Sequence, residues 1–212
     1  MKLHTLLARC GRLSLIAACA CAALGARAET ITYTFSALAS GTLRTFAGTT
    51  TSFTDRALVV TIPTETANID TTRFGPDIPA THNLVRGFLS IDGVGSSPFN
   101  NLLYVFNNQQ SPAVGFGDLT HNDLFSIVNS TAGLGSYGLV TPLGPIGGRT
   151  GTEVWRQFNS VIFDFGAITL TSDLQNVSFQ AALAAVPEPQ TWGLMLAGLG
   201  FVGALARRRA RA

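Results

Sequence analysis

Short runs in which apolar and polar residues alternate constrain the fold of this chain more than any other feature. Over residues 30–36, Ile31, Tyr33 and Phe35 alternate with threonine or serine, which is typical of a strand that buries one face. Six more segments have the composition of strands: 57–62, 84–91, 102–106, 123–128, 161–170 and 177–183. This pattern predicts an all-β domain over residues 29–185, an antiparallel β-sandwich for which a jelly roll is one possible connectivity.

Turn and loop residues separate these segments. Four pairs predict turns: Asp92-Gly93, Ser97-Pro98, Asn107-Asn108 and Gly147-Gly148. Residues 130–152 contain seven glycines and two prolines, and we predict a long surface loop there. The pattern leaves the order of the strands in the sheets open.

The N-terminus has the three parts of a secretory signal peptide. A positive region, an apolar run and a peptidase site follow one another: Lys2, Arg9 and Arg12, then residues 13–24, then Ala26-Arg27-Ala28. We predict that signal peptidase removes residues 1–28 and that the mature chain begins at Glu29. An uncleaved anchor, a buried helix and a lipoprotein signal at Cys19 are the alternatives.

All three cysteines lie in the segment that we expect to be removed: Cys10, Cys19 and Cys21. The mature domain then has no disulfide, no Cys-ligated metal and no thiol nucleophile. Its stability must therefore come from core packing.

The C-terminus, residues 186–212, also has three ordered parts. The first is extended, because proline restricts both itself and the residue before it: Val186, Pro187, Glu188 and Pro189. Residues 191–206 carry no charge and would form a membrane helix about 24 Å long. The last part is a basic cluster that the positive-inside rule keeps in the cytoplasm: Arg207, Arg208, Arg209 and Arg211. This order predicts a single transmembrane helix with the domain outside.

The three parts resemble the PEP-CTERM sorting signal, which is found in exported proteins of Gram-negative bacteria that make extracellular polysaccharide and biofilm. The resemblance implies that exosortase, a membrane-embedded transpeptidase, recognises the tail and cleaves at or near Pro187-Glu188-Pro189. It implies an anchor in the inner membrane before processing, and a place at the cell surface or in the extracellular matrix afterwards. The protein would then be a substrate of that enzyme and not an enzyme itself.

The charge of the folded region argues against nucleic acid as a partner. Residues 29–186 contain six arginines, no lysine and eleven acidic residues, so this region is mildly acidic. A nucleic-acid binder needs a basic face on its domain. The formal net charge of +2 for the whole chain comes from its two basic ends.

Few residues could carry chemistry. Asp118, His121 and Asp123 are close in sequence, and two carboxylates with one imidazole suit a divalent metal. The alternative is a solvated turn in which these side chains bond to the local backbone. His82 is the other histidine of the mature chain, and no Gly-x-Ser-x-Gly pattern marks a nucleophile. We therefore predict no cofactor and no catalytic residue.

Trp155 is the one tryptophan of residues 29–185, and it lies beside Arg156 and Gln157. An exposed tryptophan here would offer a stacking surface to sugar rings, whereas a buried one would belong to the core. The leading hypothesis is a non-enzymatic surface protein associated with extracellular polysaccharide. A carbohydrate-binding module that uses Trp155 is the second hypothesis, and an exported hydrolase is the third.

Overall fold

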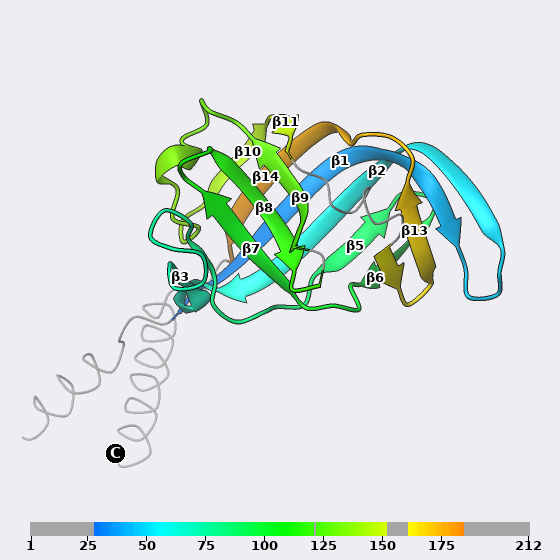
Figure 1. Cartoon of the computed structure of the whole chain (residues 1–212), viewed down its shortest axis with the longest axis horizontal. Coiled ribbons are helices and arrows are strands. Elements are labelled where there is room, and N and C mark those ends of the chain that lie inside the picture. Colours follow the sequence, from blue (N-terminus) through cyan, green and yellow to red (C-terminus); the bar gives the residue numbers. More distant parts are fainter. Residues whose placement is uncertain (1–27, 121, 152–160, 185–212) are drawn as a thin grey trace, which may run out of the picture. The chain divides into compact units, whose positions relative to one another are not determined.

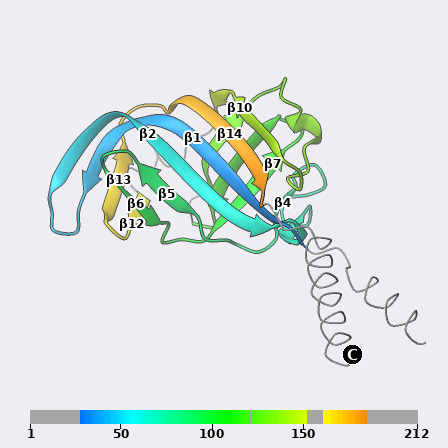
Figure 2. The same cartoon turned by 180° about the vertical axis from the view of Figure 1, so that it is seen from behind.

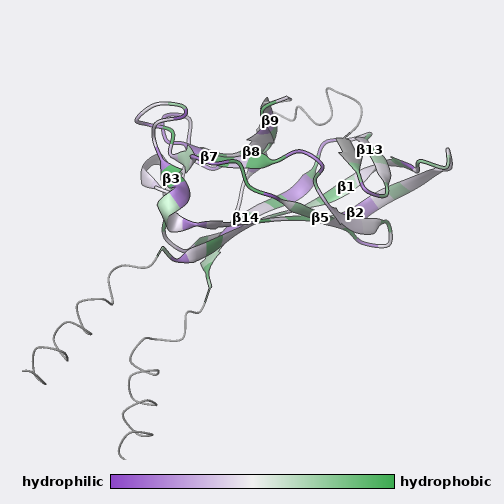
Figure 3. Ribbon diagram, turned by 90° about the horizontal axis from the view of Figure 1, so that it is seen from below, coloured by the Kyte–Doolittle hydropathy of each residue, from purple (hydrophilic) through white to green (hydrophobic). Residues whose placement is uncertain are grey.

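Two antiparallel sheets pack face to face: Figure 1 looks onto the smaller sheet with the larger one behind it, and Figure 3 shows the two layers from below. The computed structural model describes residues 28–120, 122–151 and 161–184. Within these ranges there is no α-helix, and so no helix there is long and apolar enough to cross a membrane. The predicted all-β antiparallel sandwich is confirmed. The predicted signal peptide and the transmembrane helix over residues 191–206 lie outside the described residues.

The larger sheet has eight strands. Its main path runs through β10 (Leu143–Gly147), β14 (Gln175–Leu183), β1 (Thr30–Arg44), β2 (Thr50–Glu65), β5 (Phe88–Ile91) and β6 (Gly95–Pro98). A hairpin of β12 (Val161–Phe163) and β13 (Gly166–Leu170) pairs with the far half of β1. Figure 2 shows this sheet in front, with the long β1–β2 hairpin running across it.

The smaller sheet has six strands. Their spatial order is β11 (Arg149–Thr150), β9 (Asn122–Val128), β8 (Ala113–Asp118), β7 (Leu103–Asn108), β4 (Ala80–Thr81) and β3 (Ile69–Asp70). Two short 3₁₀ helices lie in the connections, η1 (Thr66–Asn68) and η2 (Leu134–Ser136). The chain crosses between the two sheets several times, so consecutive segments of the sequence contribute to both layers.

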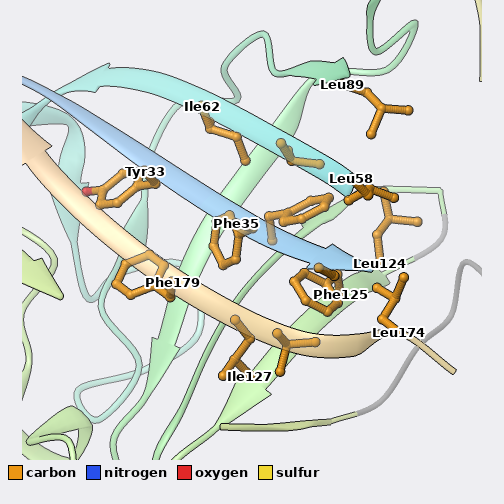
Figure 4. Close-up of a cluster of buried hydrophobic side chains, with 14 of the residues drawn as sticks. Tyr33, Phe35, Leu58, Ile62, Leu89, Leu124, Phe125, Ile127, Leu174 and Phe179 are labelled. Atoms are coloured by element: carbon orange, nitrogen blue, oxygen red, sulfur yellow. The ribbon is translucent and has the colours of Figure 1, made fainter. Parts of the chain in front are cut away.

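Aromatic rings fill the space between the sheets (Figure 4). Phe35 of β1 and Phe179 of β14 point inwards from the larger sheet, and their ring centroids lie 5.1 Å apart. Two rings of the smaller sheet meet Phe35 edge-on, with centroids 5.0 Å away for Phe116 and 5.9 Å away for Phe125. The apolar face that the alternation predicted for residues 30–36 therefore joins the two layers.

Strand β1 is longer than the sequence predicted. It continues past Ser36 because small residues keep the alternation, and Ala37, Ala39 and Gly41 all face the core. A Cβ atom at Gly41 would lie 2.3 Å from the carbonyl oxygen of Thr169 in β13. The close approach of the two strands at this point thus requires glycine.

Several smaller predictions are wrong, and each has a local reason. Residues 161–170 form the β12–β13 hairpin instead of one strand, and Gly166 adopts a φ of 145° at its turn. Ser97-Pro98 belongs to β6, an edge strand, where proline does not interrupt a ladder. Asn107-Asn108 ends strand β7 rather than forming a turn.

The segment 130–152 is not a surface loop throughout, contrary to the prediction. Leu134, Tyr137 and Leu139 are buried and belong to the main core. The hydroxyl of Tyr33 donates a hydrogen bond of 2.7 Å to the carbonyl oxygen of Leu139, which fixes this segment to β1. The same segment supplies β10 to one sheet and β11 to the other.

Candidate functional site

Most of the residues predicted to carry function lie outside the described residues. They are Val186, Pro187, Glu188 and Pro189 of the sorting motif, the basic cluster Arg207, Arg208, Arg209 and Arg211, and also Trp155 and His121. The exposure of Trp155 therefore stays untested. Within the described ranges, the candidates are Asp118, Asp123 and His82.

The two ends of the sandwich are neighbours in the larger sheet. Ile31 near the start of β1 pairs with Leu183 at the end of β14. The backbone N–H of Ala184 donates a hydrogen bond of 2.8 Å to the carbonyl oxygen of Thr30. In the sequence, the sorting motif begins two residues after this hydrogen bond. The tail thus follows directly from a strand that is paired on both sides.

Asp118 and Asp123 both receive hydrogen bonds from the protein. Asp118 is buried at the end of β8 and accepts from the Asn101 side-chain amide at 2.9 Å and from the Thr120 backbone N–H at 2.8 Å. Asp123 is half-buried on β9 and accepts from the Tyr104 hydroxyl at 3.1 Å. These bonds fit the alternative of a hydrogen-bonded turn. Among the described residues, no three His, Cys, Asp or Glu side chains are placed to hold a metal ion.

Burial and the hydrogen bond from Tyr104 shift the pKa of Asp123 in opposite directions. Burial raises the pKa of the Asp123 carboxyl above its ordinary value, and the hydrogen bond from Tyr104 lowers it in part. The pKa of Tyr104 is raised by burial first and by the Asp123 charge second. The Tyr104 hydroxyl therefore stays protonated and donates the hydrogen bond to Asp123. This pair is consequently a fixed structural contact at neutral pH.

His82 forms the clearest acid–base contact of the described residues. Its Nδ1 lies 2.9 Å from a carboxylate oxygen of Asp70, the last residue of β3. The Thr72 hydroxyl donates to the other Asp70 oxygen at 2.9 Å and lies 3.3 Å from the same His82 nitrogen. The His82 side chain is 59% exposed, and neither partner lines a groove described below.

The neighbourhood of His82 fixes the connection between β3 and β4. Arg73 donates through Nε to the carbonyl oxygen of Thr81 at 3.1 Å and through a terminal nitrogen to that of His82 at 2.5 Å. Its guanidinium carbon also lies 5.8 Å from the centre of the Tyr104 ring. A hydrolase would need a nucleophile beside the free Nε2 of His82, and the hydroxyl of Thr72 approaches Nδ1 instead. These side chains are thus better explained as contacts that hold the connection between β3 and β4 in place.

Replacing Asp70 with asparagine should make the stability of the domain less dependent on acid. The backbone N–H of Thr72 is the main cause that lowers the pKa of Asp70 below its ordinary 3.8, and the Thr72 hydroxyl and His82 add to it. A carboxyl with a depressed folded-state pKa stabilises the fold above about pH 4 and loses this effect as the pH falls through the folded value. We expect Asp70→Asn to lower Tm by about 1–2 °C at pH 6 and by less at pH 3.

Thermal melts of the wild type and Asp70→Asn at both pH values test this expectation. Thr72→Ala is the matched variant, because it keeps the backbone N–H bond and should retain most of the pH dependence. An equal difference in Tm at pH 3 and pH 6 would contradict the assignment.

A shallow groove of about 680 Å³ lies on the outer face of the smaller sheet. Asp123 and Arg149 contribute charges of opposite sign, and Ser126 and Thr150 contribute hydroxyls. Phe106 also lines this groove, and its ring lies over Gly115, where a Cβ atom would be 2.8 Å from the ring. Gly151, the last described residue before 152–160, also lines the groove.

The comparisons with known proteins identify the tail. The C-terminal tail is a sorting signal of the kind that exosortase processes, which supports export of the chain. More narrowly, residues 185–210 match the family described as the PEP-CTERM protein-sorting motif, which confirms the resemblance read from residues 186–211. The match implies exosortase as the processing partner of this tail. Comparison with the curated proteins and with the solved structures gave no match.

Proposed function

We propose that exosortase cleaves this protein at or near Pro187-Glu188-Pro189 and that the sandwich then associates with extracellular polysaccharide without catalysing a reaction. The observation that carries the proposal is the match of residues 185–210 to the sorting motif. The basic and apolar start of the chain supports entry into the export pathway and removal of residues 1–28 by signal peptidase.

The sequence of the tail has the properties expected of a substrate for a membrane-embedded transpeptidase. An extended Pro-Glu-Pro backbone is in the form that a peptidase needs to bind, because no ladder hydrogen bond has to be broken first. The uncharged span of residues 191–206 would hold that backbone at the membrane surface. The basic cluster would stop translocation, since arginines resist crossing the bilayer.

The absence of catalysis is supported by how the titratable groups of the sandwich are used. His82 and Asp70 face one another on an exposed connection, and Asp118 is bonded to the amide of Asn101 and a backbone N–H. Each of these groups has a structural partner. A domain that serves as a surface module needs this kind of fixed scaffold and no activated nucleophile.

Deletion of residues 186–212 tests the proposal most directly. We expect the shortened protein to be exported and then lost from the surface fraction into the medium or periplasm, because it has no signal for exosortase. A matched variant, Pro187→Ala with Pro189→Ala, keeps the span and the arginines and should remain uncleaved in the inner membrane. Immunoblots of the membrane, surface and medium fractions measure both effects. Unchanged surface retention of the shortened protein would contradict the role of the tail.

Mass spectrometry of the surface-fraction protein tests the cleavage separately. The expected C-terminal peptide ends at or near Pro189. A mature surface form that still contains residues 191–211 would overturn processing while leaving export intact.

A further inference from the structure

The outer face of the larger sheet carries a row of uncharged side chains that runs across five strands. Phe88 of β5 pairs with Pro98 of β6 on one side and with Thr61 of β2 on the other. Thr61 in turn pairs with Thr34 of β1, and Thr34 pairs with Gln180 of β14. Neighbouring strands are about 4.8 Å apart, so this row presents an aromatic ring, two hydroxyls and an amide over about 19 Å.

A second row lies two residues further along the same strands. Ser90 of β5 pairs with Ser96 of β6 and with Val59 of β2. Val59 pairs with Ser36 of β1, which pairs with Ser178 of β14. The second row thus adds four hydroxyls beside the first, about 7 Å away along the strands. Neither row contains a charged side chain.

The two rows enclose a hollow around Phe88. The Phe88 side chain is 45% exposed, although its strand neighbour Leu89 is buried in the core. A hollow of about 320 Å³ lies at this position, and its lining includes Val59 and Thr61 of β2, Phe88 and Ser90 of β5, and Ser96 and Pro98 of β6. Of the described elements, none lies over this face in Figure 2.

We propose that these two rows, here called the hydroxyl face, bind a neutral polysaccharide through stacking on Phe88 and hydrogen bonds to the serine and threonine hydroxyls. This inference rests on the proposed association with extracellular polysaccharide and names its binding surface and the charge class of its ligand. An exposed ring offers the C–H face of a sugar an apolar contact. Hydroxyls and an amide both donate and accept, which suits the hydroxyls of a sugar.

The charge distribution decides between neutral and acidic ligands. The nearest recorded ion pair, Arg56 with Asp92 at 3.9 Å, lies at the β5–β6 turn end of the face and is itself balanced. An acidic polysaccharide would require unpaired arginines or lysines among the two rows. A membrane surface or an apolar partner protein would require more exposed apolar area than one ring supplies.

Affinity electrophoresis of the purified processed protein tests this proposal. Native gels contain hydroxyethyl cellulose or dextran as neutral polymers, or alginate as an acidic one. We expect retardation in at least one neutral gel and none in alginate. Phe88→Ala should weaken the apparent affinity about tenfold, because truncating a central aromatic contact typically has this effect. Thr61→Val, which keeps the shape but removes one hydroxyl, should weaken it less.

Phe46→Ala is the matched control, since Phe46 is 71% exposed at the turn of the β1–β2 hairpin, and about 26 Å of strand separates Ser36 from Arg44 at the end of β1. It should leave the retardation unchanged, and circular dichroism should show all variants folded. No retardation in either neutral gel, retardation in alginate alone, or equal retardation of Phe88→Ala and wild type would each overturn the proposal. Loss of a dimer in Phe88→Ala without glycan binding would assign the face to a second copy of the chain. Sorting is measured by fractionation, so failure here is distinguishable from failure of the proposed processing.

Discussion

Phe35→Ala is expected to lower the free energy of unfolding of the sandwich by about 3–5 kcal/mol. The Phe35 side chain is fully buried and touches aromatic rings of both sheets, with Phe116 and Phe125 across the interface and Phe179 beside it. Alanine would leave a cavity that these rings cannot close without moving the strands that carry them. Because a domain of this size is stable by only about 5–15 kcal/mol, the loss is a large fraction of the whole.

Urea unfolding followed by circular dichroism measures the effect. Phe46→Ala is again the control, because it removes the same atoms from a side chain that is 71% exposed, and it should change the free energy of unfolding by less than about 0.5 kcal/mol. The dependence of the free energy on urea concentration should be alike in all three proteins. A loss below about 1 kcal/mol for Phe35→Ala would show that the two sheets are not held together through this ring.

The strands that could be predicted from the sequence are those whose own residues carry a recognisable strand pattern. In β1, the alternation of Ile31, Tyr33 and Phe35 with hydroxyl residues is enough to predict a strand and its buried face. Strands β7 and β9 could be recognised for a different reason, because their apolar residues are large and close together. These segments need no partner to be recognised, since alternation and a dense apolar run are both local properties.

Strand β8 shows why other elements were not predictable. Its sequence has two glycines in six residues, which gives it low intrinsic strand propensity. It is a strand because Val114 and Phe116 are fully buried, and because Gly115 lets the Phe106 ring of the next strand lie across it. A side chain at Gly115 would meet that ring and the carbonyl oxygen of Phe125. The reason for the glycine therefore lies in the neighbouring strands.

The candidate sites also differ in whether the sequence alone could predict them. The sorting tail could be read from the sequence because its recognition depends on the order of three segments within 27 residues of one another. The hydroxyl face could not, because Phe88, Thr61, Thr34 and Gln180 become neighbours only through the pairing of four strands. A serine or threonine on a strand is unremarkable until the sheet aligns it with others.

The segment 130–152 is held to the core by buried hydrogen bonds that its glycine-rich composition does not predict. Asn107 of β7 is fully buried, and its side-chain amide donates at 2.7 Å to the carbonyl oxygen of Leu134 and at 2.8 Å to that of Tyr137. These two bonds hold η2 against the smaller sheet. The glycines of segment 130–152 predict a loop, whereas Asn107 of β7 holds the part of this segment around η2 in a fixed position.

Asn107→Asp should therefore destabilise the sandwich strongly at neutral pH, by about 3–5 kcal/mol. The new carboxylate would have the same shape but would place a negative charge against two carbonyl oxygens. The folded state would then keep the carboxyl protonated, so its pKa would lie above the unfolded value of about 3.9. A group with a raised folded-state pKa destabilises the fold progressively as the pH rises above the unfolded value. The loss should thus be smaller at pH 4, where the protonated acid can still donate one of the two bonds.

Urea unfolding at pH 4 and pH 7 measures this difference, each time relative to the wild type. Asn108→Asp is the matched control, because Asn108 is only half-buried and its side-chain oxygen accepts a hydrogen bond of 3.0 Å from the Ser111 backbone N–H, which a carboxylate accepts equally well. We expect little change in that variant at either pH. If Asn107→Asp were as stable as the wild type at pH 7, or lost more stability at pH 4 than at pH 7, the two bonds from Asn107 would not be what anchors the segment. Since both variants add one negative charge to adjacent positions of the same strand, their contrast isolates the buried bonds from the change in net charge.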